Sequence, residues 1–318
     1  MRSMRLRGHL WTLWPLFRAV TRPPRQPAGE PWRERVPDDA MGTVELTGLL
    51  RRPDGARDLL ILLHGLGGSA TSRYLPPAVR CADRCGLATL RLNLRGSDLE
   101  GQDIYHAGLS CDLASTLASE QLADFERIYV FGYSLGGHIA LRYATEVEDP
   151  RLRAVAAVCT PLDMERAQRN FDRRSCGLYR RYILHSLKQI YASVAARRPV
   201  PHPPQVVSRI TTIREFDACT VVPRFGFRSP EDYYRKVSVG PLLGGLRVPS
   251  LLVEVDGDPM VPLDTVRPWL AGASPQLDVR FVRRGGHVGF PADLDLGFDA
   301  PPGIENQLIH WLLRYRDG

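Results

Sequence analysis

The chain contains 318 residues, of which 44% are hydrophobic and 24% charged, a composition that excludes a disordered chain, a collagen and a coiled coil. Basic residues outnumber acidic ones by 42 to 35, but they are spread along the whole sequence. Because a nucleic-acid-binding protein gathers its positive charge on one face or in one tract, we expect no nucleic-acid partner.

The first predicted element is an amphipathic helix whose apolar face contains Leu6, Leu10, Leu13, Trp14 and Phe17. Residues 1–29 lack acidic side chains, as signal and transit peptides do, but Thr12, Pro15 and Arg18 interrupt the apolar run. We expect this segment to dock on the body of the protein, and contact with a membrane surface stays open. An extended linker is then predicted from Pro23, Pro24, Pro27 and Pro31.

Strands and helices alternate along most of the remaining chain. Apolar runs and alternating patterns predict strands at 43–51, 59–63, 87–94, 128–131, 154–159, 250–255 and 277–282. Helices are predicted at 71–85, 134–145, 178–196 and 304–315. This alternation indicates an α/β fold with a mostly parallel sheet flanked by helices.

The alternation lapses between residues 161 and 246, which we interpret as an insertion. The chain is therefore divided into an N-terminal segment and linker (1–42), a first core part (43–160), the insertion (161–246) and a second core part (247–318). No stretch of 18 apolar residues predicts a membrane-spanning helix.

Six cysteines are too few for a disulfide scaffold, which fits reduced thiols and a cytoplasmic protein. Cys81 and Cys85 lie one helical turn apart, but the sequence shows no His or Cys cluster that would complete a metal site. We therefore expect no bound metal.

The strongest motif is GxSxG, formed by Gly132, Ser134 and Gly136 between a predicted strand and a predicted helix. A serine on such a sharp turn needs small neighbours two positions away on each side, and the helix that follows favours negative charge at the site. We expect Ser134 to be a nucleophile.

A serine nucleophile needs a base, and the base needs an acid that holds its ring. Among eight histidines we select His287, in a Gly-rich loop between the last strand and the last helix. Asp258 and Asp256 both follow the strand 250–255; we prefer Asp258 and keep Asp256 as the alternative. The resulting order Ser, Asp, His is the one expected of α/β-hydrolases.

An oxyanion hole is expected from the loop after strand 59–63, whose supporting residues are His64, Gly65 and Gly67. The predicted donors are the backbone N–H groups of Leu66 and Leu135. The same loop fits the GxGxxA dinucleotide fingerprint. The next strand lacks the acid that this motif requires, although Arg95 could meet a 2′-phosphate, so we disfavour this alternative.

Taken together, HGLGG, GYSLGG, DGDPMVP and GGHVGF resemble the α/β-hydrolase superfamily. Residues 8–13, the NLRGS stretch 93–97, the YHAG stretch 105–108 and the segments FDA, GF and DYY at 216–234 are similar to the YheT-like family, the fourth AB-hydrolase family. The chain departs from that family at Trp11, where the family has Gln, and in the loop 98–103, which lacks the usual Cys-Ser-Gly run.

The resemblance implies a serine hydrolase that acts on small-molecule acyl esters, needs no cofactor, and uses residues 161–246 as a cap over the site. Some relatives transfer medium-chain acyl groups to alcohols, so an alcohol acyltransferase is the alternative within the same chemistry. A non-catalytic binding protein on the same fold is the alternative from another class.

Overall fold

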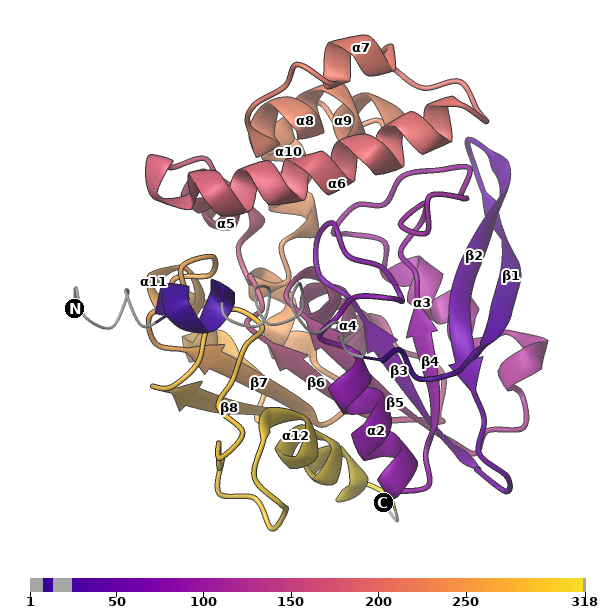
Figure 1. Cartoon of the computed structure of the whole chain (residues 1–318), viewed down its shortest axis with the longest axis vertical. Coiled ribbons are helices and arrows are strands. Elements are labelled where there is room, and N and C mark those ends of the chain that lie inside the picture. The colour runs from indigo at the N-terminus through magenta and orange to yellow at the C-terminus, as the bar shows by residue number, and fades with distance from the viewer. Residues whose placement is uncertain (1–7, 14–24, 317–318) are drawn as a thin grey trace.

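The computed structural model describes residues 8–13 and 25–316. Its centre is an eight-stranded sheet in the order β1-β2-β4-β3-β5-β6-β7-β8 (Figure 1). The strands are β1 (Glu30–Asp38), β2 (Gly42–Arg51), β3 (Asp58–Leu63), β4 (Ala88–Leu92), β5 (Arg127–Tyr133), β6 (Leu152–Val158), β7 (Ser250–Val255) and β8 (Leu277–Val282). The β1–β2 and β2–β4 pairs are antiparallel and the other five pairs are parallel, so the α/β fold expected from the sequence is confirmed.

Helices cover both faces of the sheet (Figure 1). In the core they are α2 (Pro76–Arg84), α3 (Ser110–Leu117), α4 (Leu135–Glu146), α11 (Leu263–Val266) and α12 (Ile304–Leu313). Short 3₁₀ turns occur at η1 (Glu120–Leu122), η2 (Arg174–Cys176), η3 (Gly240–Gly245) and η4 (Arg267–Gly272). Within the described parts of the chain, no helix has the length and apolar character needed to cross a membrane.

The two faces of the sheet bury separate hydrophobic cores, and β3 contributes to both because its side chains alternate. Leu59, Ile61 and Leu63 pack on the face covered by α3 and α4. Leu60 and Leu62 pack on the opposite face, beneath α2 and α12. Burial on both faces explains why β3 is a continuous apolar run.

Residues 161–246 contain helices and no strand: α5 (Met164–Phe171), α6 (Gly177–Ala195), α7 (Pro204–Val207), α8 (Ile213–Cys219), α9 (Val221–Arg224) and α10 (Pro230–Val237). Figure 1 shows these helices as one layer beyond one end of the sheet, with α6 running across it. That end is where the parallel strands finish, and the loops that follow the strands lie there.

The sheet contains a strand that was not expected, β1, which precedes the predicted strands in the chain. The linker predicted around Pro31 is wrong at that residue, because Pro31 lies inside β1, paired with Leu49 of β2. A proline is tolerated there because β1 is an edge strand with one unpaired side.

The predicted N-terminal helix is described in part, since residues 8–13 are helical. Among the residues used to predict it, Leu6, Trp14 and Phe17 lie outside the described residues, as do Pro23 and Pro24 of the linker.

Candidate active site

Ser134 lies on the sharp turn between β5 and α4. Its φ of 53° and ψ of −117° are strained for a residue with a side chain. A Cβ on Gly132 would lie 2.3 Å from the Gly136 carbonyl oxygen, and a Cβ on Gly136 would lie 2.5 Å from the Leu63 oxygen. The close approach of these backbones therefore requires both glycines of the motif, as the strand-turn-helix interpretation predicts.

Asp258 and His287 meet directly although they follow different strands, β7 and β8. Asp258 Oδ2 lies 2.8 Å from His287 Nδ1, and the two residues are 3% and 4% exposed. The other oxygen of Asp258 accepts hydrogen bonds from the N–H groups of Met260 (2.7 Å) and Val261 (3.1 Å). The carboxylate that contacts the imidazole is thus that of Asp258, and we find no such contact for Asp256 among the described residues.

Ser134 is linked to this pair through the end of β6. The Ser134 N–H donates to the Val158 carbonyl at 2.8 Å, and the next residue, Cys159, has its sulfur within 4.8 Å of ligand atoms of both Asp258 and His287. Within the described residues the Ser134 hydroxyl makes no hydrogen bond, so the structure brings Asp258 and His287 together without a Ser134–His287 hydrogen bond. Catalytic hydrogen bonds are often long before substrate binds.

The loop after β3 runs alongside Ser134. A Cβ on Gly65 would lie 3.2 Å from Ser134 Cβ and 3.7 Å from its Oγ. The Gly65 N–H donates to the Tyr74 hydroxyl at 2.8 Å, and the Gly67 N–H donates to the Tyr105 hydroxyl at 2.7 Å.

The two N–H groups expected to form an oxyanion hole have no hydrogen-bond acceptor in the described ranges, in contrast to the N–H groups of Gly65 and Gly67. The N–H of Leu66 has no acceptor among the described residues. Leu135 is the first residue of α4, where N–H groups lack intrahelical acceptors. Both groups are free to bind an oxygen of a substrate.

His64 and His138 are buried, and a polar atom lies close to each of their ring nitrogens. His64 Nε2 accepts from the Leu94 N–H at 3.1 Å, its Nδ1 lies 2.8 Å from the Gly65 oxygen, and burial lowers its pKa to about 4. The ring nitrogens of His138 lie 2.7 Å and 2.9 Å from the carbonyl oxygens of Pro161 and Val237, and burial lowers its pKa as well. Neither imidazole has a nitrogen free to act as a base.

The N-terminal helical turn, residues 8–13, contacts both the His287 loop and the cap. Thr12 Oγ1 accepts a hydrogen bond from the His287 N–H at 2.9 Å, and His9 Nδ1 lies 2.7 Å from the Tyr179 hydroxyl of α6. A Cβ on Gly286 would lie 2.4 Å from the Thr12 nitrogen, so only glycine allows this approach. Sequence analysis missed these contacts, although the resemblance of residues 8–13 to a family motif had singled the segment out.

A second carboxyl group lies beneath the site. Glu254, on β7, is fully buried, and its Oε1 accepts a hydrogen bond from the Thr160 N–H at 2.8 Å. Burial, together with the nearby Asp258, raises the pKa of Glu254 well above its usual range. One signal of this group is present in the sequence, because Glu254 is the one acid in the apolar run of β7.

Arg95 is not available to bind a 2′-phosphate, so it cannot replace the acid that the dinucleotide fingerprint requires and this sequence lacks. Its guanidinium is 3% exposed and pairs with Asp38 (2.6 Å), Asp103 (2.9 Å) and Asp112 (2.7 Å). Arg224 of α9 contacts Asp38 and Asp103 in the same cluster, which therefore joins the core to the cap.

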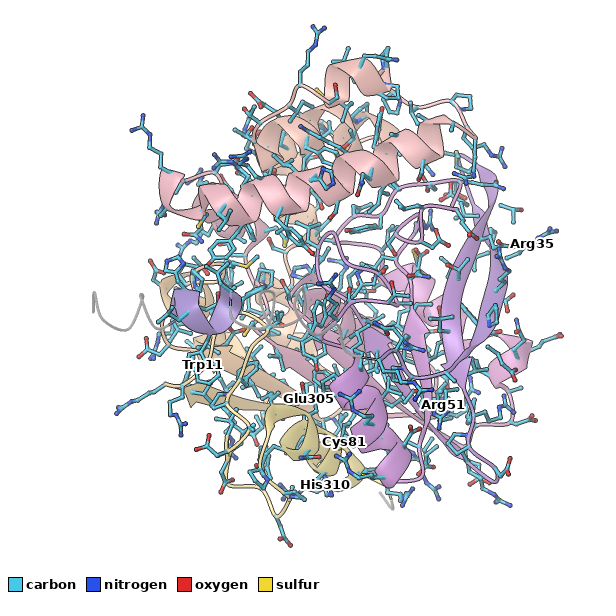
Figure 2. The ribbon with its side chains drawn as sticks, viewed as in Figure 1. Trp11, Arg35, Arg51, Cys81, Glu305 and His310 are labelled. Atoms are coloured by element: carbon cyan, nitrogen blue, oxygen red, sulfur yellow. The ribbon has the colours of Figure 1, made fainter. Side chains whose placement is uncertain are left out.

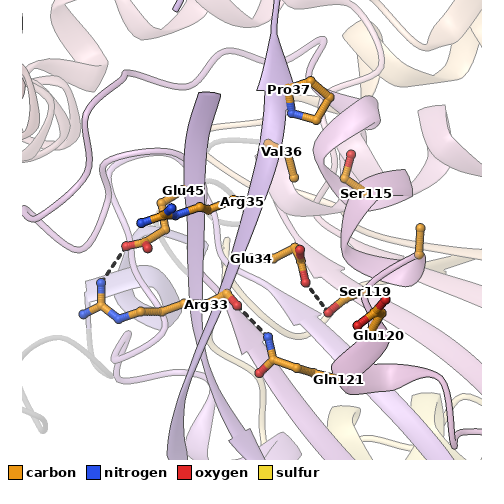
Figure 3. A pocket seen from close by; sticks show the side chains of 11 residues that line it. Arg33, Glu34, Arg35, Val36, Pro37, Glu45, Ser115, Ser119, Glu120 and Gln121 are labelled. Atoms are coloured by element: carbon orange, nitrogen blue, oxygen red, sulfur yellow. Dashed lines mark hydrogen bonds and ion pairs between the residues drawn. The ribbon is translucent and has the colours of Figure 1, made fainter. Parts of the chain in front are cut away.

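A hollow of about 690 Å³ lies away from these residues, between β1 and α3 (Figure 3). Its charged and polar groups are largely paired with each other, since Arg33 contacts Glu45 and Glu34 contacts Ser119 (Figure 3). None of the site residues expected from the sequence lines it.

Comparisons with known proteins agree with the fold. The model of the alpha/beta hydrolase fold family matches residues 58–293. The chain is 29% identical to the YheT protein of Escherichia coli over 80% of this chain and 76% of that protein. Two Saccharomyces cerevisiae proteins are also similar. One is named monoacylglycerol lipase (24% identity, 76% of this chain), and the other medium-chain fatty acid ethyl ester synthase/esterase 2 (25% identity, 73% of this chain).

The chain spans only 56% and 58% of the length of these two yeast proteins. Among solved structures, the Pyrococcus furiosus esterase Pf2001 matches with a TM-score of 0.53 and 16% identity, covering 82% of this chain and 83% of that one. At this identity the likeness shows the fold.

Proposed function

Because the chain belongs to the α/β-hydrolase family, we propose that it is a serine hydrolase that cleaves carboxylic acyl esters, with Ser134, His287 and Asp258 as its triad. The observation that supports the triad best is the buried contact between Asp258 Oδ2 and His287 Nδ1 at 2.8 Å. The YheT-like resemblance and the esterase and lipase names of similar proteins support an ester substrate.

In the first step His287 acts as the base. A carboxylate can only accept hydrogen bonds, so the contact with Asp258 fixes the ring proton on Nδ1 and leaves the lone pair on Nε2. Nε2 takes the Ser134 proton while Oγ attacks the ester carbonyl carbon, which produces a tetrahedral oxyanion. Asp258 stabilises the charged imidazolium that results.

The oxyanion is held by the Leu66 and Leu135 N–H groups, which have no other acceptor in the described chain. When the tetrahedral intermediate collapses, the carbon–oxygen bond to the alcohol breaks and His287 gives that oxygen its proton. A water molecule, deprotonated by His287, then attacks the acyl-enzyme, and Ser134 recovers its proton as the carboxylic acid leaves.

Residues of the cap support the proposal that the enzyme recognises an apolar acyl group in its substrate. A Cβ on Gly67 would lie 3.2 Å from Ser186 Cβ of α6, so this helix crosses directly over the oxyanion loop. Ile183 and Leu187 of α6 are buried in the same core as Leu135. Apolar side chains on a cap helix that crosses the oxyanion loop favour a hydrocarbon chain as the acyl part of the substrate.

The proposal is tested with p-nitrophenyl esters of increasing acyl length on the parent protein and on Ser134→Ala. We expect Ser134→Ala to lose several orders of magnitude in kcat while retaining its thermal unfolding temperature. A fluorophosphonate probe should label the parent and leave the variant unlabelled. Unchanged turnover in Ser134→Ala would refute the triad, and a folded parent that is neither labelled nor active would favour a non-catalytic binding protein.

Acyl transfer to an alcohol is the second candidate, supported by the similarity to a protein named as an ethyl ester synthase as well as an esterase. It uses the same acyl-enzyme, with an alcohol in place of water in the last step. Hydrolysis of a medium-chain ester in the presence of ethanol separates the two: ethyl ester formation that exceeds the ethanol-to-water ratio would indicate a transferase.

A further inference from the structure

The helices α2 and α12 bring together three metal-binding side chains that are separate from the proposed triad. The sulfur atoms of Cys81 and Cys85 and a ring nitrogen of His310 lie within 4.8 Å of one another. From the sequence we expected no His or Cys cluster to complete a metal site with Cys81 and Cys85, and the fold places His310 beside them. His310 was missed because it lies 225 positions or more from the cysteines and becomes their neighbour only when α12 packs on α2. Figure 2 shows Cys81 and His310 where these helices lie side by side.

We propose that Cys81, Cys85 and His310 form a binding site for a zinc ion that joins α2 to α12. Two thiolates and one imidazole are the ligands that zinc prefers, whereas calcium and magnesium prefer oxygen ligands. Zinc–ligand distances of roughly 2.0 to 2.3 Å require the donor atoms to be about 3.5 to 4 Å apart. The three donor atoms lie within 4.8 Å of one another, so zinc binding requires them to move closer together by at most about 1 Å.

The surroundings of His310 already orient its ring. Its Nδ1 lies 2.8 Å from the carbonyl oxygen of Asn306, one turn earlier in α12. A carbonyl oxygen only accepts, so Nδ1 carries the proton and the lone pair is on Nε2. A ring N–H held by a backbone carbonyl is the usual arrangement around a metal-binding histidine.

Asn306 also supports the thiol side of the site. Its Oδ1 accepts hydrogen bonds from Cys81 Sγ at 3.1 Å and from the Arg84 guanidinium at 2.8 Å. Zinc binding removes the Cys81 thiol proton and with it the hydrogen bond from Cys81 to Asn306. The Arg84 guanidinium continues to hold the Asn306 side chain in place. Two thiol protons leave as two sulfur–zinc bonds form, so the dication and two thiolates give a neutral centre.

Access to the site is from one side. Cys81 is 1% exposed, whereas Cys85 and His310 are partly exposed, so an ion can enter from the surface and reach the buried thiol. The described residues supply three ligands, and water can fill the fourth position.

The location suggests what the ion does. The helix α2 follows the oxyanion loop, and α12 follows the His287 loop. An ion shared by the two helices binds the folded chain and not the unfolded one, so it stabilises the fold that holds these loops.

The test is a zinc titration of the full chain after treatment with a chelator, in competition with a chromophoric zinc indicator. We expect one zinc per chain and a zinc-dependent rise in unfolding temperature. Cys85→Ser and His310→Gln should each weaken zinc binding by more than about 100-fold. The matched control is Cys111→Ser, an exposed cysteine outside the group, which should bind zinc as the parent does.

A second group, Cys159, Asp258 and His287, could also take an ion, so the titration is repeated in His287→Asn. Retention of the zinc in this variant assigns it to α2 and α12, and its loss overturns the proposal. Cobalt substitution gives an independent readout, since thiolate ligation produces a near-ultraviolet charge-transfer band that Cys85→Ser should weaken. If Cys85→Ser and His310→Gln, both folded without metal, bind zinc like the parent, the site does not exist.

Discussion

The hydroxyl of Thr12 accepts a hydrogen bond from the backbone N–H of His287, at 2.9 Å and across 275 positions of sequence. Thr12 is 3% exposed and also donates to the Gly8 carbonyl at 2.8 Å. The N-terminal turn is thus part of the structure that fixes the catalytic histidine of the proposed triad.

Thr12→Ala should impair catalysis through His287, because Thr12 is not expected to contact the substrate. It leaves the buried His287 N–H without an acceptor, which costs about 1 to 3 kcal/mol and loosens the loop. We expect kcat to fall roughly 10-fold and the pH–rate profile to shift, because the environment of the imidazole changes. Thr12→Ser keeps the oxygen and should restore both the rate and the profile; a Thr12→Ala enzyme with an unaltered profile would argue against positioning.

The two candidate acids provide a matched pair of variants. Asp258→Asn can no longer hold the Nδ1–H tautomer of His287, and we expect kcat to fall by about 10⁴. Asp256→Asn removes a carboxylate that does not contact the ring and should remain within a few-fold of the parent. The reverse ranking in steady-state kinetics would assign the acid to Asp256.

Arg95→Ala should strongly destabilise the protein. Removal of the guanidinium leaves the buried Asp112 without its counter-ion and leaves Asp38 and Asp103 with Arg224 alone, which costs about 3 to 5 kcal/mol. The control is Arg33→Ala, an exposed arginine whose pairs with Glu45 and Glu100 are screened by water and should contribute little to stability. Urea unfolding measures both changes; equal losses would mean that the cluster adds no net stability.

Glu254 should make stability fall as the pH rises. Its pKa is raised in the folded protein, so the folded state binds the proton more tightly than the unfolded state. The resulting stabilisation is complete below the unfolded pKa, near 4.3, and is lost as the pH rises toward the folded pKa.

Glu254→Gln removes this dependence while keeping an oxygen for the Thr160 N–H. Relative to the variant, the parent should lose up to about 1.4 kcal/mol of unfolding free energy per pH unit above pH 5. Parallel stability–pH curves for the two proteins would show that Glu254 ionises normally.

The central strands and the order of the site loops were predictable from local sequence. The ranges expected for β7 and β8 match the observed ones, because β7 is buried along its whole length and is a nearly continuous apolar run, whereas β8, a partly exposed edge strand, alternates apolar and charged residues. Parallel strands end at one edge of a sheet, which is why Ser134, Asp258 and His287 could be assigned to a common edge before their contacts were known.

The strand β1 and the helix α3 were not predicted. In β1 three consecutive charged residues separate the buried side chains Trp32 and Val36, so no alternating pattern marks a strand, and prolines near both ends resemble a linker. Pairing with β2, and not local preference, decides the conformation of this edge strand.

Contacts between distant polar side chains could not be predicted either. Thr12 with His287, Arg95 with its three carboxylates, and His310 with the two thiols leave no periodic pattern in the sequence. Each depends on the packing of elements that are far apart in the chain, which hydrophobic periodicity does not encode.

The two partners of the Thr12–His287 hydrogen bond are made at very different times during translation. A ribosome that adds about 5 to 20 residues per second makes Thr12 roughly 14 to 55 s before its partner exists. During that interval Tyr179, the partner of His9, has already been made, but the His287 N–H has not, so the N-terminal turn can be joined to the cap before it is joined to the His287 loop.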